Sequence, residues 1–114
     1  MKSTEVVRAL GALAQESRLA VFRLLVKRGP DGYSPGELAE KLEISGPTLS
    51  FHLKELQQAR LIVSRRDGRF LYYSANFAQM NQLVDFLTEN CCSLSDATCG
   101  PNCAPSQQAR GKRI

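Results

Sequence analysis

Hydrophobic residues recur at helical spacing in the first third of the chain and predict two amphipathic helices. The apolar positions that mark them are Val6, Val7, Leu10 and Leu13, then Leu19, Phe22, Leu25 and Val26. The segment Gly29-Pro30-Asp31-Gly32 consists of residues that favour turns, so we expect the second helix to end there.

Two further helix starts follow in close succession. Ser34 can cap a helix that has Pro35 at its first position, and Glu37 completes a capping box. We expect this helix to run to about Leu42. Ser45 is the predicted N-cap of the next helix, in which one apolar stripe is formed by Leu49, Leu53 and Leu56. Two helices joined by so short a link are typical of a helix-turn-helix.

The pattern changes from helical to strand-like at Leu61. Residues 61–66 and 69–74 are predicted strands, and Asp67-Gly68 between them is typical of a type I′ hairpin turn. A last amphipathic helix is marked by Phe77, Met80, Leu83, Val84 and Leu87. The order of elements predicts a mainly α fold with a β-hairpin wing, of the α+β class: a winged helix-turn-helix.

The apolar stripe of the last helix is too rich for a helix exposed to solvent, so we expect it to pack against a second copy of the chain. Val6, Val7 and Leu10 are expected to join it in a homodimer. We therefore divide the chain into a DNA-binding and dimerisation domain (1–90), a cysteine-rich ion-binding segment (91–103) and a tail expected to be disordered (104–114).

Length and charge narrow the class of protein. A chain of 114 residues forms one domain, and a net charge of +4 is compatible with a nucleic-acid partner. No apolar run approaches the roughly 20 residues that span a bilayer. Because the N-terminus also lacks a signal-peptide pattern, we expect a cytoplasmic protein with no membrane partner.

The second helix of the helix-turn-helix carries the candidate contacts to double-stranded DNA: Ser45, Gly46, Pro47, Thr48, Ser50, Phe51, His52 and Lys54. Hydroxyls and the helix start can bind phosphates, and Thr48 and Ser50 can also reach base edges. Phe51 either contacts a thymine methyl group or turns into the core, and the sequence favours neither. His52, the only histidine, is assigned to DNA or to helix packing.

Three arginines surround the predicted hairpin tip: Arg65, Arg66 and Arg69. A basic hairpin can lie along phosphates or enter a minor groove. A solvated charged hairpin is the alternative, but beside a helix-turn-helix we favour contact with nucleic acid.

Residues from about 8 to 87 resemble the ArsR/SmtB family of metal-responsive bacterial repressors. The matching segments are Leu13–Leu19, Glu37–Ala39, Ser45–Leu56 and Leu61-Ile62. The resemblance implies a homodimer, paired through its first and last helices, that leaves a near-palindromic operator when an ion binds. The chain departs from the family in having Arg60 where a glycine is usual, and no cysteine in the helix that starts near Ser34.

All four cysteines lie in one short segment: Cys91, Cys92, Cys99 and Cys103. Soft ions prefer thiolate ligands, and trivalent arsenic or antimony takes three sulfurs. Cys91 and Cys92 can provide two of them, with Cys99 favoured as the third because its loop is shorter and Cys103 as the alternative. Adjacent cysteines do not fit the usual spacing of a four-cysteine zinc site.

The expected function is therefore a repressor released from its operator by trivalent arsenic, with no organic cofactor. Arsenite is the first candidate inducer, and antimonite and organoarsenicals remain open, as does a site shared between two chains. The alternatives are a thiol redox-responsive repressor on the same fold and a small thiol-dependent reductase. We disfavour an enzyme because no basic residue lies next to a cysteine in sequence to activate it.

Overall fold

The structure, a computed structural model, describes residues 1–95. Cys99, Cys103 and the predicted tail at 104–114 lie outside the described residues. In chain order the elements are α1 (Ser3–Leu13), α2 (Glu16–Arg28), α3 (Pro35–Leu42), α4 (Gly46–Gln58), β1 (Ile62–Asp67), β2 (Phe70–Ala75) and α5 (Phe77–Thr88). The predicted winged helix-turn-helix is confirmed: helices α3 and α4 form the helix-turn-helix, and β1 and β2 form the wing.

Local hydrogen bonds set the limits of α3 and α4. The Ser34 hydroxyl accepts from the Glu37 amide and the Glu37 carboxylate accepts from the Ser34 amide, so the predicted capping box is present. Glu43 ends α3 in the left-handed conformation. Ser45 is the N-cap of α4 by position, but its hydroxyl donates to Oγ1 of Thr48 at 2.9 Å and makes no capping bond to the backbone.

The hairpin turn differs from the prediction by one residue. Asp67 pairs with Phe70, so the two-residue loop is Gly68-Arg69 rather than Asp67-Gly68. A type I′ turn needs positive φ at both loop residues, and here only Gly68 has it, at 63°. Glycine at the first loop position, followed by a residue with negative φ, is typical of a type II′ turn. Arg69 therefore sits at the tip of the wing and not in a strand.

One hydrophobic core joins the helices to the base of the wing. Its largest fully buried side chains are Val21, Leu25, Leu38, Leu49, Leu56, Leu61 and Ile62. A β-bridge between Tyr33 and Tyr73 holds the loop before α3 against β2. This loop needs glycine at position 32, because φ is +73° and a Cβ there would overlap the Tyr73 carbonyl oxygen.

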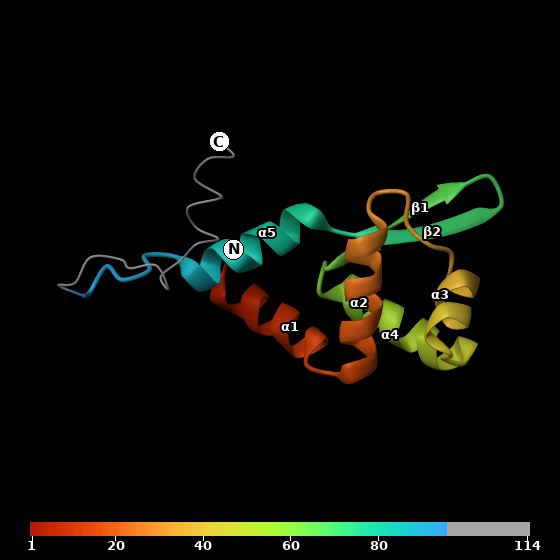
Figure 1. The fold of residues 1–114 in the computed structure, drawn as a ribbon, viewed down its shortest axis with the longest axis horizontal. Coiled ribbons are helices and arrows are strands. Elements are labelled where there is room, and N and C mark those ends of the chain that lie inside the picture. Colours follow the sequence, from red (N-terminus) through yellow and green to blue (C-terminus); the bar gives the residue numbers. More distant parts are fainter. Residues whose placement is uncertain (96–114) are drawn as a thin grey trace.

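The helices and the wing are arranged in two groups at opposite ends of the molecule (Figure 1). Helices α1 and α5 lie side by side at one end, and the wing, α3 and α4 lie toward the other, with α2 between them. Within residues 1–95 no helix has the length and apolar character needed to cross a bilayer.

Candidate nucleic-acid interface and thiol pair

Helix α4 presents one polar face to solvent. Leu49, Leu53 and Leu56 are buried on the opposite side, as their spacing predicted. The exposed residues are Gly46, Pro47, Thr48, Ser50, Phe51, Lys54, Gln57 and Gln58, preceded by exposed Ser45. Phe51 is 55% exposed, so the alternative that it turns into the core is wrong. This face combines hydroxyls, one cation and one aromatic ring, which suits contact with phosphates and base edges.

His52 does not lie on that face. It is only 7% exposed, so the assignment to DNA contact is not supported and the alternative of helix packing is the better account. Its Nδ1 lies 3.4 Å from Nη1 of Arg18 on α2, and Nε of Arg18 also donates to the Ala12 carbonyl at 2.8 Å. Burial, and then the positive charge of Arg18, lower the pKa of His52 below its ordinary value of 6.5. The neutral imidazole therefore accepts from Arg18 and couples α4 to α2.

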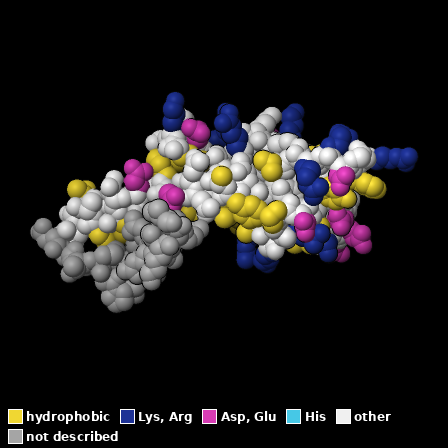
Figure 2. All heavy atoms as spheres, turned by 90° about the horizontal axis from the view of Figure 1, so that it is seen from above, with side chains coloured by type: hydrophobic (Ala, Val, Ile, Leu, Met, Phe, Trp, Pro, Cys, Tyr) yellow, Lys and Arg dark blue, Asp and Glu magenta, His cyan; other side chains and the backbone are white. Residues whose placement is uncertain are grey.

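The three wing arginines are not equivalent. The Arg65 guanidinium donates to the Asp31 carbonyl at 2.7 Å, stacks 4.8 Å from the Tyr72 ring centroid and lies 4.0 Å from the Asp67 carboxylate. Arg66 and Arg69 are exposed, and neither side chain makes a hydrogen bond or ion pair within residues 1–95. Figure 2 shows many Lys and Arg side chains at the end of the molecule that carries the wing, with acidic side chains among them.

The wing also exposes apolar side chains that the sequence analysis did not select. Phe70 is 62% exposed, and its ring centroid lies 6.3 Å from that of Tyr72. Both rings project from the same side of β2, since residues two apart in a strand share a face. The alternation of residues along β2 would have predicted that Phe70 and Tyr72 share a face. An aromatic ring beside Arg69 gives the wing tip an apolar surface that can pack against a sugar or a base step.

Cys91 and Cys92 follow the end of α5 after Glu89 and Asn90, and both are exposed. Their sulfurs are 3.6 Å apart, well beyond the disulfide bond length of about 2.05 Å. Two sulfurs that bind one ion at about 2.3 Å, the zinc–thiolate distance, lie at most about 4.6 Å apart, so this spacing fits one shared ion. Within residues 1–95 no group of three His, Cys, Asp or Glu residues is placed to hold a metal. A site of three thiolates would need a ligand from outside the described residues.

The two thiols interact with each other. The hydrogen bond with Cys91 is the main cause that holds the pKa of Cys92 above the ordinary thiol value, and the charge of Cys91 acts in the same direction. The protonated form of Cys92 is therefore favoured, and the thiol would have to lose that proton to bind an ion. A raised pKa also makes Cys92 a poor nucleophile for redox or reductase chemistry.

A family model described as a helix-turn-helix domain matches residues 13–65. The chain is 34% identical to the transcriptional repressor SdpR of Bacillus subtilis, over 67% of this chain and 81% of that protein. It is 36% identical to the arsenical resistance operon repressor of the same species, over 71% of this chain and 73% of that protein. Three other curated relatives are matched over only 58 to 63% of their own length.

Solved structures show the same likeness. An ArsR-like transcriptional regulator from Rhodococcus matches with 30% identity and a TM-score of 0.67, over 74% of this chain and 76% of that one. A homodimeric winged helix-turn-helix domain from Mycobacterium bovis, described as a possible ArsR-family regulator, matches with 27% identity and a TM-score of 0.60. That match covers 76% of this chain and 81% of that one.

The buried His52 predicts a pH dependence of stability. Its pKa is lower in the folded chain than in the unfolded chain, so between the two values the unfolded chain binds more protons. The free energy of unfolding therefore falls as the pH drops below about 6.5 and is fully retained above it. The variant His52→Gln should lack this pH-dependent contribution. Its free energy of unfolding, measured with denaturant between about pH 7.5 and pH 5.5, should therefore change less with pH than that of wild type. Parallel profiles for the two proteins would contradict the assignment.

Proposed function

Because the chain belongs to the ArsR family of winged helix-turn-helix transcriptional regulators, we propose that it is a repressor that binds double-stranded operator DNA as a homodimer. Trivalent arsenic, as arsenite, is the proposed inducer that releases it. The observation that carries this inducer is the pair of exposed thiols at the end of α5, with sulfurs 3.6 Å apart. The similarity to an arsenical resistance operon repressor supports the same inducer.

The geometry of α4 and the wing supports the DNA-binding part of the proposal. The polar face of α4 can enter a major groove, where Thr48 and Ser50 reach base edges and Phe51 reaches a thymine methyl group. Arg66 and Arg69 on the wing then meet the adjacent backbone or minor groove. Arg65 contributes less, because its guanidinium is already engaged by Asp31 and Asp67.

The apolar residues of α1 and α5 support the dimer. Val6 and Leu83, also expected at the dimer surface, are buried in the core of this chain. On α1, Val7 is 68% and Leu10 41% exposed, and on α5 Leu87 is 58% exposed. These side chains lie on the two helices that Figure 1 shows next to each other at one end of the molecule. Burying such side chains against a second copy stabilises the dimer by about 25 cal/mol for each Å² of apolar surface. The homodimeric relative from Mycobacterium bovis has the same fold.

The thiol pair supports a link between ion binding and the dimer. Cys91 and Cys92 lie shortly beyond the end of α5, so an ion that joins them to Cys99, or to Cys103, restrains the end of a dimer helix. The ion shifts the equilibrium only by its different affinity for the DNA-bound and free forms. A hundredfold loss of DNA affinity needs about 2.7 kcal/mol of coupling, which is a usual allosteric magnitude.

A thiol redox switch remains the second candidate, since two adjacent cysteines can also form a disulfide. The raised pKa of Cys92 weighs against it, because the thiolate is the reactive form. We propose no catalytic role, for the same reason. Antimonite, or a methylated arsenical that needs only two thiols, is compatible with the same pair.

Replacing Leu87 with glutamate tests the dimer. A charge at the proposed interface should raise the dimer dissociation constant at least about tenfold, or about 1.4 kcal/mol. Leu19→Glu is the matched control, because Leu19 is a similarly exposed leucine on α2. Light scattering at micromolar concentration should give a dimer mass for wild type and the control. A monomer mass for wild type, or equal dissociation of both variants, would contradict the proposal.

Replacing Arg69 with alanine tests the wing. Loss of one phosphate contact should weaken binding to every DNA sequence and lower the salt-dependence slope by about one unit. Arg65→Ala should change the slope less, because Arg65 is held within the chain. The measurement is fluorescence anisotropy over a salt series with operator and unrelated DNA. A change in sequence preference with no change in slope would show that Arg69 reads bases instead.

Replacing either Cys91 or Cys92 with serine tests the inducer site. Each variant should bind operator DNA with wild-type affinity but require at least about a hundredfold more arsenite for release, since one of the two ligands of the pair is lost. Release is measured by the anisotropy of a labelled operator during an arsenite titration.

Cys103→Ser is the matched control and should respond as wild type does, because Cys99 is the favoured third ligand. If Cys91→Ser and Cys92→Ser both release operator DNA at the arsenite concentration that suffices for wild type, the proposed site is excluded. Release of wild type by peroxide but not by arsenite would favour the redox alternative.

A further inference from the structure

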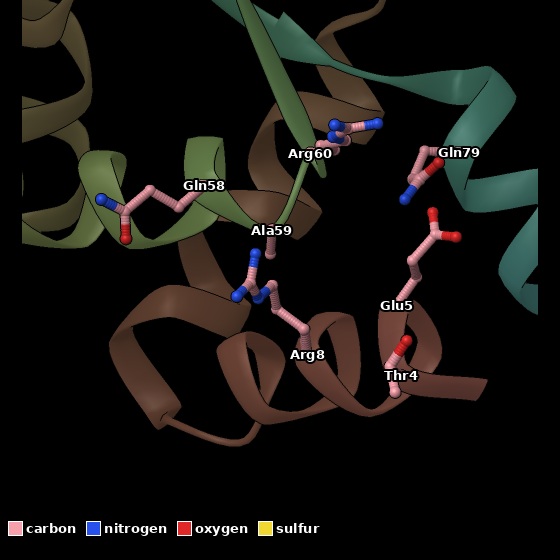
Figure 3. A pocket seen from close by; sticks show the side chains of 7 residues that line it. All are labelled: Thr4, Glu5, Arg8, Gln58, Ala59, Arg60 and Gln79. Carbon is pink, nitrogen blue, oxygen red and sulfur yellow. The ribbon is translucent and has the colours of Figure 1, made fainter. Parts of the chain in front are cut away.

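A polar hollow lies where α1 meets the end of α4 and the start of α5 (Figure 3). Its volume is about 360 Å³, within the usual range for small-molecule sites. The lining residues are Thr4, Glu5, Arg8, Gln58, Ala59, Arg60 and Gln79. The exposed apolar residues of the proposed dimer surface, Val7, Leu10 and Leu87, are not among them. The hollow thus has a polar lining that differs from the DNA-binding face of α4 and from these apolar residues, although part of the lining belongs to the same helices, α1 and α5.

Gln79 is the first indication of a ligand. Its side chain is only 9% exposed, and its amide makes no hydrogen bond within residues 1–95. The backbone amide of Gln79 donates to Oδ1 of Asn76, but the side chain turns into the hollow toward Glu5. Among residues 1–95 no polar side-chain atom is both fully buried and without a hydrogen-bond partner, so the amide atoms of Gln79 reach the solvent in the hollow. A polar ligand in the hollow would replace that solvent as the partner of the amide.

Arg60 is the second indication. Its φ is +63°, a left-handed conformation that glycine adopts without strain and arginine does not. The Asn76 side chain holds it there by donating to the Arg60 carbonyl at 3.0 Å. This conformation ends α4 as a Schellman cap, because the Arg60 amide donates to the Gln57 carbonyl and the Leu61 amide to the Leu56 carbonyl, each at 3.0 Å. Arg60 lies on the wall of the hollow, opposite the helix that carries Arg8.

We propose that this hollow binds a small oxyanion, a carboxylate or phosphate group, on a molecule that also carries a hydrogen-bond donor. Arg8 and Arg60 bind the anionic group, because guanidinium matches the geometry of both carboxylate and phosphate. The Gln79 amide and the Glu5 carboxylate contact the rest of the molecule, with Glu5 accepting from the donor. Two guanidinium groups against one carboxylate leave the hollow with an excess of positive charge.

Nuclear magnetic resonance of the full chain tests this site without DNA or arsenic, so its result is independent of the proposed function. The two probes are citrate, which carries carboxylates and a hydroxyl group, and inorganic phosphate. The side-chain amide signals of Gln79 report directly on the hollow. Titration should shift them saturably with one or both probes, and the probe that binds more tightly identifies the preferred oxyanion.

Arg60→Gly separates the site from the fold. Glycine relieves the left-handed strain, so this variant should melt at a higher temperature than wild type while its affinity for the probe falls at least about tenfold. Arg23→Gln, which loses the same charge at an exposed position of α2 outside the hollow, should bind as wild type does. The proposal is overturned by the absence of a saturable shift with both probes. Equal affinity of wild type and Arg60→Gly would overturn it too.

Discussion

Burial of Leu49, Leu53 and Leu56 along one side of α4 is the constraint on which the rest of the structure depends. Each fully buried leucine contributes about 1.5–3 kcal/mol, so together they outweigh any preference of the polar residues on the opposite side. The rotation of α4 about its axis is set by this stripe. Thr48, Ser50 and Lys54 face solvent as a consequence, and Phe51 is exposed with them although it is aromatic.

The same constraint explains the two roles of neighbouring residues on α4. Phe51 and His52 are adjacent, with ring centroids 5.8 Å apart, yet one faces solvent and the other faces α2. A step of about 100° along the helix separates them and carries His52 to the edge of the buried stripe. Arg18 then supplies the hydrogen bond that a buried imidazole requires, which ties the position of α4 to α2.

Electrostatic contacts on the wing are weaker than this packing. The pair formed by Arg65 and Asp67 is exposed and 4.0 Å long, and such pairs contribute at most about 1 kcal/mol. The bond from Arg65 to the Asp31 carbonyl anchors the wing to the loop after α2. One arginine of the wing thus attaches the wing to the rest of the chain, while the other two, Arg66 and Arg69, are exposed.

The two ends of α5 have different chemical surroundings. Its start is capped by Asn76, which also fixes Arg60 and so shapes the polar hollow. Its end leads into two exposed thiols whose mutual hydrogen bond favours the protonated form of Cys92. An ion that replaces those protons would act on the helix from one end, and a small oxyanion from the other.

The sequence by itself determined the features that depend on close neighbours in the chain. The capping box of Ser34 and Glu37, the leucine stripe of α4 and the existence of the hairpin all follow from residues a few positions apart. Only the tertiary structure decided the burial of His52, the engagement of Arg65 and the hollow around Gln79. These rest on pairs such as Arg18 with His52 and Asp31 with Arg65, each 34 positions apart. Such contacts form only when separately predicted elements pack together, and local periodicity holds no information about which side chains will then meet.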